Sequence, residues 1–195
     1  MSNSPAGDGR PFSELIEAEI TRRKSKREVK KAIFDTLRAI LLIAAASVLL
    51  STLLLSVLRV NRSSMSPTLK DGEIVIALKR VPVNRGDIIA FYYNNKLLVK
   101  RVTAKAGDWV DIDEDGTVSV NGVALDEPYV TEKAFGECNI RLPYQVPDGS
   151  FFVMGDHRVA SLDSRSTEIG TVHKDMVEGK VFLRIWPLPK IKLFM

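Results

Sequence analysis

The chain has 195 residues, enough for one ordinary domain and an additional segment. Its net charge is +4, and residues 1–38 hold nine Lys/Arg against six Asp/Glu, so the rest is nearly neutral at 19 against 18. Nucleic-acid binders carry a basic excess on the folded domain, which argues against nucleic acid as a partner. The single Cys138 excludes an intramolecular disulfide, and two histidines beside it do not make a structural zinc site.

The N-terminal part is polar and basic. Residues 1–12 have the Gly- and Pro-rich composition of a disordered tail. Residues 13–31 lack Gly and Pro, and seven Lys/Arg cluster between Arg22 and Lys31. Two interpretations stay open for this segment: a helix lying along anionic membrane lipid, and a solvated charged helix.

An uncharged run of twenty residues, 39–58, follows the basic segment. At ~1.5 Å per residue it matches the ~30 Å hydrocarbon core, so it predicts a transmembrane helix. A buried globular helix would show a polar face, and a cleavable signal peptide would begin nearer the N-terminus. Residues 19–38 contain eight Lys/Arg and residues 59–78 only three. We therefore expect a single-pass protein of the cell membrane, with residues 1–38 in the cytoplasm and 59–195 outside.

The outer part has the pattern of a β domain. Short β-branched or aromatic runs alternate with Gly, Asp, Asn and Pro, and Asp115-Gly116 and Asn121-Gly122 are hairpin-type turns. The expected fold class is mainly β, an antiparallel sheet domain behind one N-terminal helix. The predicted strands are 73–80, 87–92, 96–103, 109–112, 117–120, 150–154 and 178–185.

Several familiar motifs are absent from the sequence. It has no Walker A loop, no H-E-x-x-H, no G-x-S-x-G elbow, and no S-x-x-K in the outer part. Asp111, Asp113 and Asp115 imitate the start of an EF-hand loop, but Gly122 stands where that loop needs a bidentate Glu. We therefore expect neither a metal nor another cofactor.

Three segments of the outer part carry reactive side chains. Ser64 lies six residues beyond Leu58, within ~22 Å of the predicted bilayer edge, although a serine cluster there also suits a polar linker. In a strand, Lys100 shares its face with Leu98 and Val102, so desolvation would favour a neutral amine able to accept a proton; a lysine at a strand edge is the alternative. Residues 155–165 form a polar turn after an apolar strand, suited to orienting side chains or simply to structure.

Together these segments resemble the bacterial type I signal peptidases, proteases with a Ser/Lys dyad that remove signal peptides from exported preproteins. The resemblance rests on Ser64-Met65-Ser66-Pro67-Thr68-Leu69, Arg85-Gly86-Asp87, Lys100-Arg101, Gly155-Asp156 through Ser161-x-Asp163-Ser164-Arg165, and Gly179-Lys180. The single anchor and compact outer domain are more similar to the Gram-positive members of that family. It implies preproteins as substrates, membrane lipid as surroundings and the protein-export machinery as a further partner.

The resemblance also implies roles for individual residues. Ser64 would be the nucleophile, Lys100 the general base and Ser161 the hydroxyl that orients Lys100, with the Ser64 N–H in the oxyanion hole. The implied supporting ion pairs involve Asp156, Asp163, Arg101 and Arg165. The substrate would bind as an extended strand, with small residues at −3 and −1. The implied groove residues are Val60, Ser63, Met65, Leu97, Leu98 and Val99.

The sequence departs from the family pattern at two places. Arg62 stands where some relatives carry a hydroxyl that serves as a second oxyanion donor, so that donor stays unassigned. His157, Val159 and Ala160 replace more usual polar residues, changes that we expect to affect loop packing rather than the dyad. A self-cleaving Ser/Lys regulator would need a DNA-binding module, for which residues 1–38 are too short. A non-catalytic membrane accessory is disfavoured by the presence of both Ser64 and Lys100.

Overall fold

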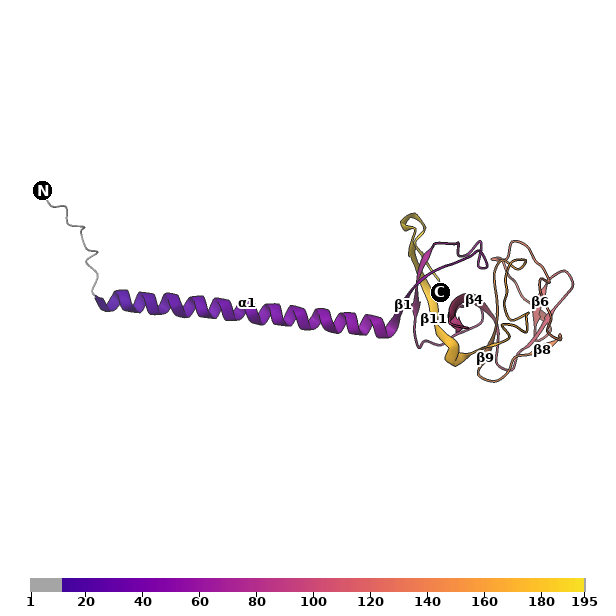
Figure 1. The fold of residues 1–195 in the computed structure, drawn as a ribbon, viewed down its shortest axis with the longest axis horizontal. Coiled ribbons are helices and arrows are strands. Elements are labelled where there is room, and N and C mark those ends of the chain that lie inside the picture. The colour runs from indigo at the N-terminus through magenta and orange to yellow at the C-terminus, as the bar shows by residue number, and fades with distance from the viewer. Residues whose placement is uncertain (1–11, 195) are drawn as a thin grey trace. The chain divides into compact units, whose positions relative to one another are not determined.

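The structure, a computed structural model, describes residues 12–194. Its first element is α1 (Phe12–Leu54), one continuous helix (Figure 1). No Gly or Pro interrupts residues 13–54, so the backbone hydrogen bonds of the helix continue from the basic segment into the apolar one. The tail predicted for residues 1–12 lies outside the described residues except for Phe12. The chain divides after Ser51 into two compact units, and the second contains all the strands.

The helix ends four residues earlier than the sequence predicts. It stops at Leu54, and residues 55–58 of the predicted spanning segment belong to strand β1 (Leu55–Arg59). β1 pairs along its length with β2 (Ile74–Leu78), which leaves Leu58 only 7% exposed. The Lys79 N–H donates to the Leu54 carbonyl at 2.9 Å, and so satisfies one carbonyl of the helix end. An apolar run alone does not distinguish a helix from a buried strand. Here the pairing of residues 55–59 with β2 makes them a strand.

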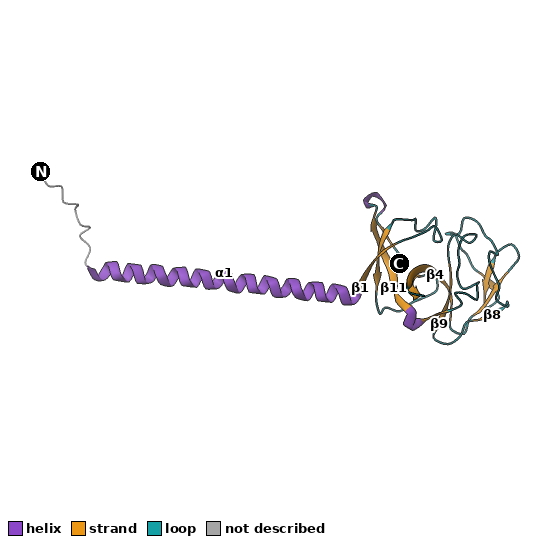
Figure 2. Cartoon of the chain, in the orientation of Figure 1, coloured by secondary structure: helices purple, strands orange, loops and turns teal. Residues whose placement is uncertain are grey.

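Two antiparallel sheets form the second unit (Figure 2). The larger has eight strands in the order β1-β2-β11-β3-β4-β9-β10, with β12 paired to β11, and the smaller has the order β7-β6-β5-β8. The fold is therefore mainly antiparallel β behind one long, partly apolar helix, as predicted. The remaining elements are β3 (Ile88–Tyr93), β4 (Lys96–Lys105), β5 (Trp109–Ile112), β6 (Val118–Val120), β7 (Val123–Ala124), β8 (Tyr144–Gln145), β9 (Ser150–Met154), β10 (Val172–His173), η1 (Lys174–Met176), β11 (Val177–Trp186), η2 (Leu188–Lys190) and β12 (Lys192–Leu193).

All seven predicted strands are present, with ends shifted by no more than two residues. The strands that the sequence did not reveal are β1, which lay inside the apolar run, and β7, β8, β10 and β12. Each of these last four has two residues. Such short pairings leave too little alternation to be read from sequence.

Strand β4 separates two hydrophobic clusters. Leu98 and Val102 pack into one cluster, and Val99 packs against the other. The alternation of a strand puts Lys100 on the Leu98 face and Arg101 on the Val99 face, as predicted. Two adjacent cations therefore face different surroundings.

Candidate active site

A groove of about 510 Å³ runs between the segment after β1 and the first half of β4. Its lining comprises residues 58–65 and 97–100, together with Ala160, Leu162 and Ile169. Ser64 and Lys100, the predicted catalytic residues, therefore share one groove. The six residues predicted to contact the substrate also line it: Val60, Ser63, Met65, Leu97, Leu98 and Val99.

Ser64 is half-buried and is held through its backbone. Its carbonyl accepts the His157 N–H at 3.0 Å, so the turn after β9 packs directly against the predicted nucleophile. Gly155 makes this approach possible, because a Cβ there would overlap both the Ser64 carbonyl and the Ser161 hydroxyl. Within residues 12–194 no acceptor binds the Ser64 N–H, which leaves it free to bind an oxyanion.

His157 departs from the family pattern next to the nucleophile. The contact with Ser64 uses the His157 backbone N–H, which almost any residue would supply. The His157 Nδ1 atom is buried and has no hydrogen-bond partner among the described residues. Val159 and Ala160, the two other departures, are exposed.

Arg62 adopts a backbone conformation that few residues other than glycine favour, with φ of 76°. Its N–H donates to the Asp71 carboxylate at 2.7 Å, which holds this turn two residues before Ser64. The exposed Arg62 side chain lines the groove. The structure identifies no second oxyanion donor at this position.

Lys100 is 4% exposed, and its Nζ donates to the Ser161 hydroxyl at 3.0 Å. Burial lowers the pKa of Lys100 to about 8, although the charge of Asp163 partly opposes the shift. Arg165 and Arg62 also lower this pKa, while Asp156 raises it. Within the described chain no hydrogen bond joins Lys100 to the Ser64 hydroxyl, so the amine contacts Ser161 in this state.

The predicted supporting residues form two ion pairs beside this lysine. Arg101 donates to both carboxylate oxygens of Asp156, at 2.9 and 2.6 Å. Arg165 binds Asp163 in the same way, at 2.9 and 3.0 Å, with both side chains 0% exposed. Burial alone would raise the pKa of Asp163, but the hydrogen bonds and charge of Arg165 and the Gly155 N–H outweigh it and keep the pKa low.

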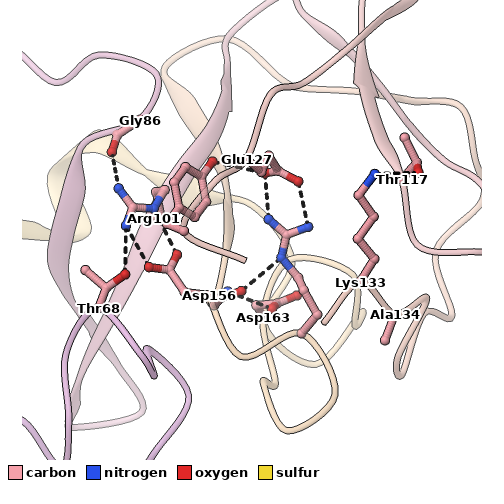
Figure 3. Close-up of polar contacts among 12 residues, drawn as sticks. Thr68, Gly86, Arg101, Thr117, Glu127, Lys133, Ala134, Asp156 and Asp163 are labelled. Carbon is pink, nitrogen blue, oxygen red and sulfur yellow. Dashed lines mark hydrogen bonds and ion pairs between the residues drawn. The ribbon is translucent and has the colours of Figure 1, made fainter. Parts of the chain in front are cut away.

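Sequence reasoning missed a third ion pair in this network. Arg158 donates to both oxygens of Glu127, at 3.0 and 2.6 Å, and the two side chains are only 1% and 2% exposed. Figure 3 shows Glu127 in the same region as Arg101 and Asp156. Arg158 was visible within the polar turn 155–165, whereas Glu127 lies in a segment without periodicity.

In the described part of the chain, no three His, Cys, Asp or Glu side chains are grouped so that they could hold a metal ion. The fold and the groove define a class: a mainly β domain that follows a long helix in the chain and holds a serine and a buried lysine in one groove.

Comparisons with known proteins identify the family. The family model described as "Signal peptidase, peptidase S26" matches residues 33–186. Signal peptidase I of Bacillus licheniformis is 33% identical in an alignment of 186 positions, and the match covers 89% of this chain and 98% of the relative. Signal peptidase IB of Staphylococcus aureus strain Mu50 is 35% identical in an alignment of 153 positions, and the match covers 68% of this chain and 78% of the relative. A crystal structure of a signal peptidase I from Enterococcus faecalis V583 covers 51% of this chain and 97% of its own, with 31% identity and a TM-score of 0.43.

The chain therefore belongs to the signal peptidase family, peptidase S26, and is a hydrolase of that family.

Proposed function

We propose that this protein is a membrane-bound serine endopeptidase that removes signal peptides from exported preproteins, with Ser64 as nucleophile and Lys100 as general base. The observation that carries the proposal is the groove shared by the Ser64 hydroxyl and a buried lysine amine. Family membership supports the reaction, since the similar proteins are named signal peptidases.

In the first step Lys100 takes the proton of the Ser64 hydroxyl, and the oxygen attacks the scissile carbonyl carbon. With a pKa of about 8, an appreciable fraction of Lys100 is neutral near physiological pH, as a base requires. The hydrogen bond to Ser161 uses one hydrogen of the amine and fixes its position. A rotation of the Ser64 side chain toward Lys100 completes the reactive arrangement, since catalytic hydrogen bonds often tighten only with substrate bound.

In the second step the Ser64 N–H stabilises the oxyanion of the tetrahedral intermediate. The Lys100 ammonium then protonates the leaving amine, the C–N bond breaks, and an acyl-enzyme ester on Ser64 remains. Water, deprotonated by the same lysine, attacks the acyl carbon of this ester. The bond to the Ser64 oxygen breaks, that oxygen takes the proton back from Lys100, and the signal peptide leaves with a free carboxylate.

The substrate lies in the groove as an extended strand. Strand β4 offers its first half along one wall, and the segment 58–63 offers the other. Leu97 to Val99 and Val60 give this groove an apolar surface, which suits small side chains at −3 and −1. The supporting residues Arg101, Asp156, Asp163 and Arg165 hold the surrounding turn without entering the reaction.

We further propose that α1 crosses the membrane once, with its N-terminus in the cytoplasm and the β domain, from residue 55 onward, outside. Residues Glu19–Leu54 of α1 include an 18-residue window of mean hydropathy 2.2 with none of it buried. Because α1 ends at Leu54, a span of about 20 residues begins near Asp35 rather than at residue 39. Arg38 then lies about one turn inside the span, where its long side chain can extend toward the headgroups.

The end of the span also brings the nucleophile close to the membrane. Ser64 lies ten residues beyond Leu54, which limits its distance from the helix end to about 36 Å. A signal peptide held in the bilayer would present its cleavage site within that zone. Membrane lipid and the protein-export machinery are accordingly the proposed surroundings of the reaction.

The direct test uses the detergent-solubilised protein, a preprotein and mass analysis of the products. We expect one cut after small residues at −3 and −1, and no cut by Ser64→Ala or Lys100→Ala, both folded. Cleavage by either purified variant would refute the dyad, and no cleavage by the wild type would indicate a non-catalytic accessory.

The pH dependence of cleavage tests the state of Lys100. A base whose pKa is lowered to about 8 gives a rate that rises with pH through that value. A rate that rises only near pH 10 would mean that Lys100 is not buried in the working enzyme.

A further inference from the structure

The turn that follows β9 contacts Ser64 directly and is linked to Lys100 through Ser161. Its His157 N–H binds the Ser64 carbonyl, and its Gly155 lies against the Ser161 hydroxyl, which in turn binds Lys100. Any displacement of this turn would move Ser64 and Lys100 relative to each other. What holds the turn therefore affects the reaction.

Arg158 makes hydrogen bonds that hold the turn in its conformation. Its Nε donates to the Gly155 carbonyl at 3.0 Å, while the Gly155 N–H donates to Asp163 at 3.0 Å. The Arg158 carbonyl accepts from Arg165 at 2.8 Å. Arg158 is 1% exposed, so its charge needs a partner inside the protein.

Glu127 is that partner, and it comes from a different part of the chain. It lies in the segment 125–143, between β7 and β8, and is 31 residues from Arg158 in sequence. Both of its oxygens accept from Arg158, and the Oε1 atom also accepts the Tyr129 hydroxyl at 3.0 Å. With three hydrogen bonds the carboxylate has a single orientation, and so does the guanidinium that it binds.

Tyr129 connects this pair to the ion pair of Arg101 and Asp156. The Arg101 guanidinium lies 3.8 Å from the centre of the Tyr129 ring and binds Asp156 at its edge (Figure 3). Burial and the neighbouring charge of Glu127 raise the pKa of Tyr129, so its hydroxyl stays protonated and remains a donor. The segment 125–143 thus reaches the turn through Glu127 and β4 through Tyr129.

We propose that Glu127 is a positioning residue for the reaction: through Arg158 it holds the turn 155–158 against Ser64 and keeps Ser161 on Lys100. Glu127 does not line the groove, and it acts on neither substrate nor reacting atoms. This inference rests on the dyad proposed above. By this inference Glu127 supports the turn beside the dyad, and the segment that carries it does more than connect two short strands.

The test is Glu127→Gln in the full-length protein, with Glu132→Gln as matched control. Glu132 lies in the same segment, is exposed, and has no ion pair or side-chain hydrogen bond among the described residues. For Glu127→Gln we expect kcat to fall on the order of 10-fold to 100-fold with KM nearly unchanged, because the substrate groove is intact. The control keeps the wild-type values.

The pH profile separates positioning from general damage. A loosened turn admits water to Lys100, so the rise of the Glu127→Gln rate with pH should move from about 8 toward the ordinary lysine value. Glu127→Asp, which keeps the charge, should recover part of the rate. Wild-type kcat and pH profile in a folded Glu127→Gln would overturn the proposal, and so would a fall in kcat with no movement of the profile.

Tyr129→Phe covers the case in which Glu127→Gln does not fold. It removes one donor to Glu127 and keeps the ring beside Arg101, so we expect a folded protein with kcat lowered about threefold, the effect of one hydrogen bond. An unchanged kcat in both this variant and a folded Glu127→Asp would overturn the proposal. Lys100→Ala is assayed in parallel: activity there refutes the dyad itself, whereas an inactive Lys100→Ala beside a fully active Glu127→Gln refutes only the role of Glu127.

Discussion

Lys100 and Arg101 are adjacent on β4 and are both shielded from water, yet their surroundings differ in kind. Lys100 shares its strand face with Leu98 and Val102, and its amine makes one hydrogen bond, to the Ser161 hydroxyl. Arg101, whose side chain is 12% exposed, binds both oxygens of Asp156 and the Gly86 carbonyl, and stacks on Tyr129. Burial lowers the pKa of Lys100 to about 8, whereas a guanidinium keeps its charge.

The contrast teaches that burial alone does not decide whether a shielded cation is structural or reactive: its side-chain type and its partners matter as well. A cation with a carboxylate on two of its nitrogens is fixed in its charged form. A cation with only a hydroxyl has no counter-charge in direct contact, and its neutral form becomes accessible. One strand can therefore carry a structural cation and a proposed base at successive positions.

The strongest test of this contrast is to place arginine at position 100 as well as at position 101. Lys100→Arg would place a guanidinium, which stays protonated, where a proton acceptor is required. We expect cleavage to fall by about 10³-fold or more, the scale at which loss of a general base acts. Preprotein cleavage above pH 9, where the wild type is most active, is the measurement, with circular dichroism to establish folding. Residual activity within tenfold of the wild type would contradict the role of Lys100 as base.

The complementary test removes the carboxylate that binds Arg101. Asp156→Asn keeps the shape of the side chain but leaves the buried guanidinium without its counter-charge, so we expect a loss of about 3 kcal/mol in the free energy of unfolding. Asp156 also raises the pKa of Lys100, so in this variant the rise of the rate should move to lower pH. Denaturant unfolding and the pH profile measure the two effects.

A matched control for Asp156→Asn is Arg85→Met. Arg85 pairs with Asp108 at 3.0 Å, but its side chain is 40% exposed. We expect less than about 1 kcal/mol for that pair, because solvent screens it. Equal losses of unfolding free energy in the two variants would mean that burial does not strengthen the ion pair of Arg101 and Asp156.

A buried lysine without a counter-charge should also cost stability, and Lys100→Met measures that cost. Folding lowers the pKa of Lys100 from about 10.5 to about 8, so between these values the unfolded chain binds more protons and stability rises with pH. Below pH 8 the full penalty is present, on the order of 3 kcal/mol. We expect Lys100→Met to raise the free energy of unfolding at pH 7 by up to about that amount, and the gain to vanish near pH 11. No gain at pH 7 would show that the lysine is not desolvated.

Sequence reasoning anticipated the two faces of β4 but not everything that surrounds them. The positions of Lys100 and Arg101 followed from the period of two, and the partners Asp156 and Asp163 from a resemblance in a short polar turn. The roles of Glu127 and Tyr129 were not predicted, because the segment 125–143 has no periodicity and contacts Arg158 and Arg101 only in the folded structure. The end of α1 was not predicted for a similar reason, since the pairing of β1 with β2 is a contact between separate segments.

The smallest expected effect concerns the one hydrogen bond that Lys100 makes. Ser161→Ala removes it and leaves the amine buried, so the base keeps its lowered pKa but loses its fixed position. We expect the rate of cleavage to fall about tenfold, the value of one well-placed hydrogen bond, with little change in thermal stability. Ser164→Ala, in the same turn, is the control. Its hydroxyl accepts the Val153 N–H at 2.9 Å, whereas the Lys100 amine donates to Ser161, so stability should fall while the rate per folded molecule stays near wild type. If both variants lower rate and stability together, Ser161 supports the turn and does not specifically orient the base. A loss of rate alone in Ser161→Ala would mean that a single hydroxyl orients Lys100, as the two carboxylate oxygens of Asp156 orient Arg101.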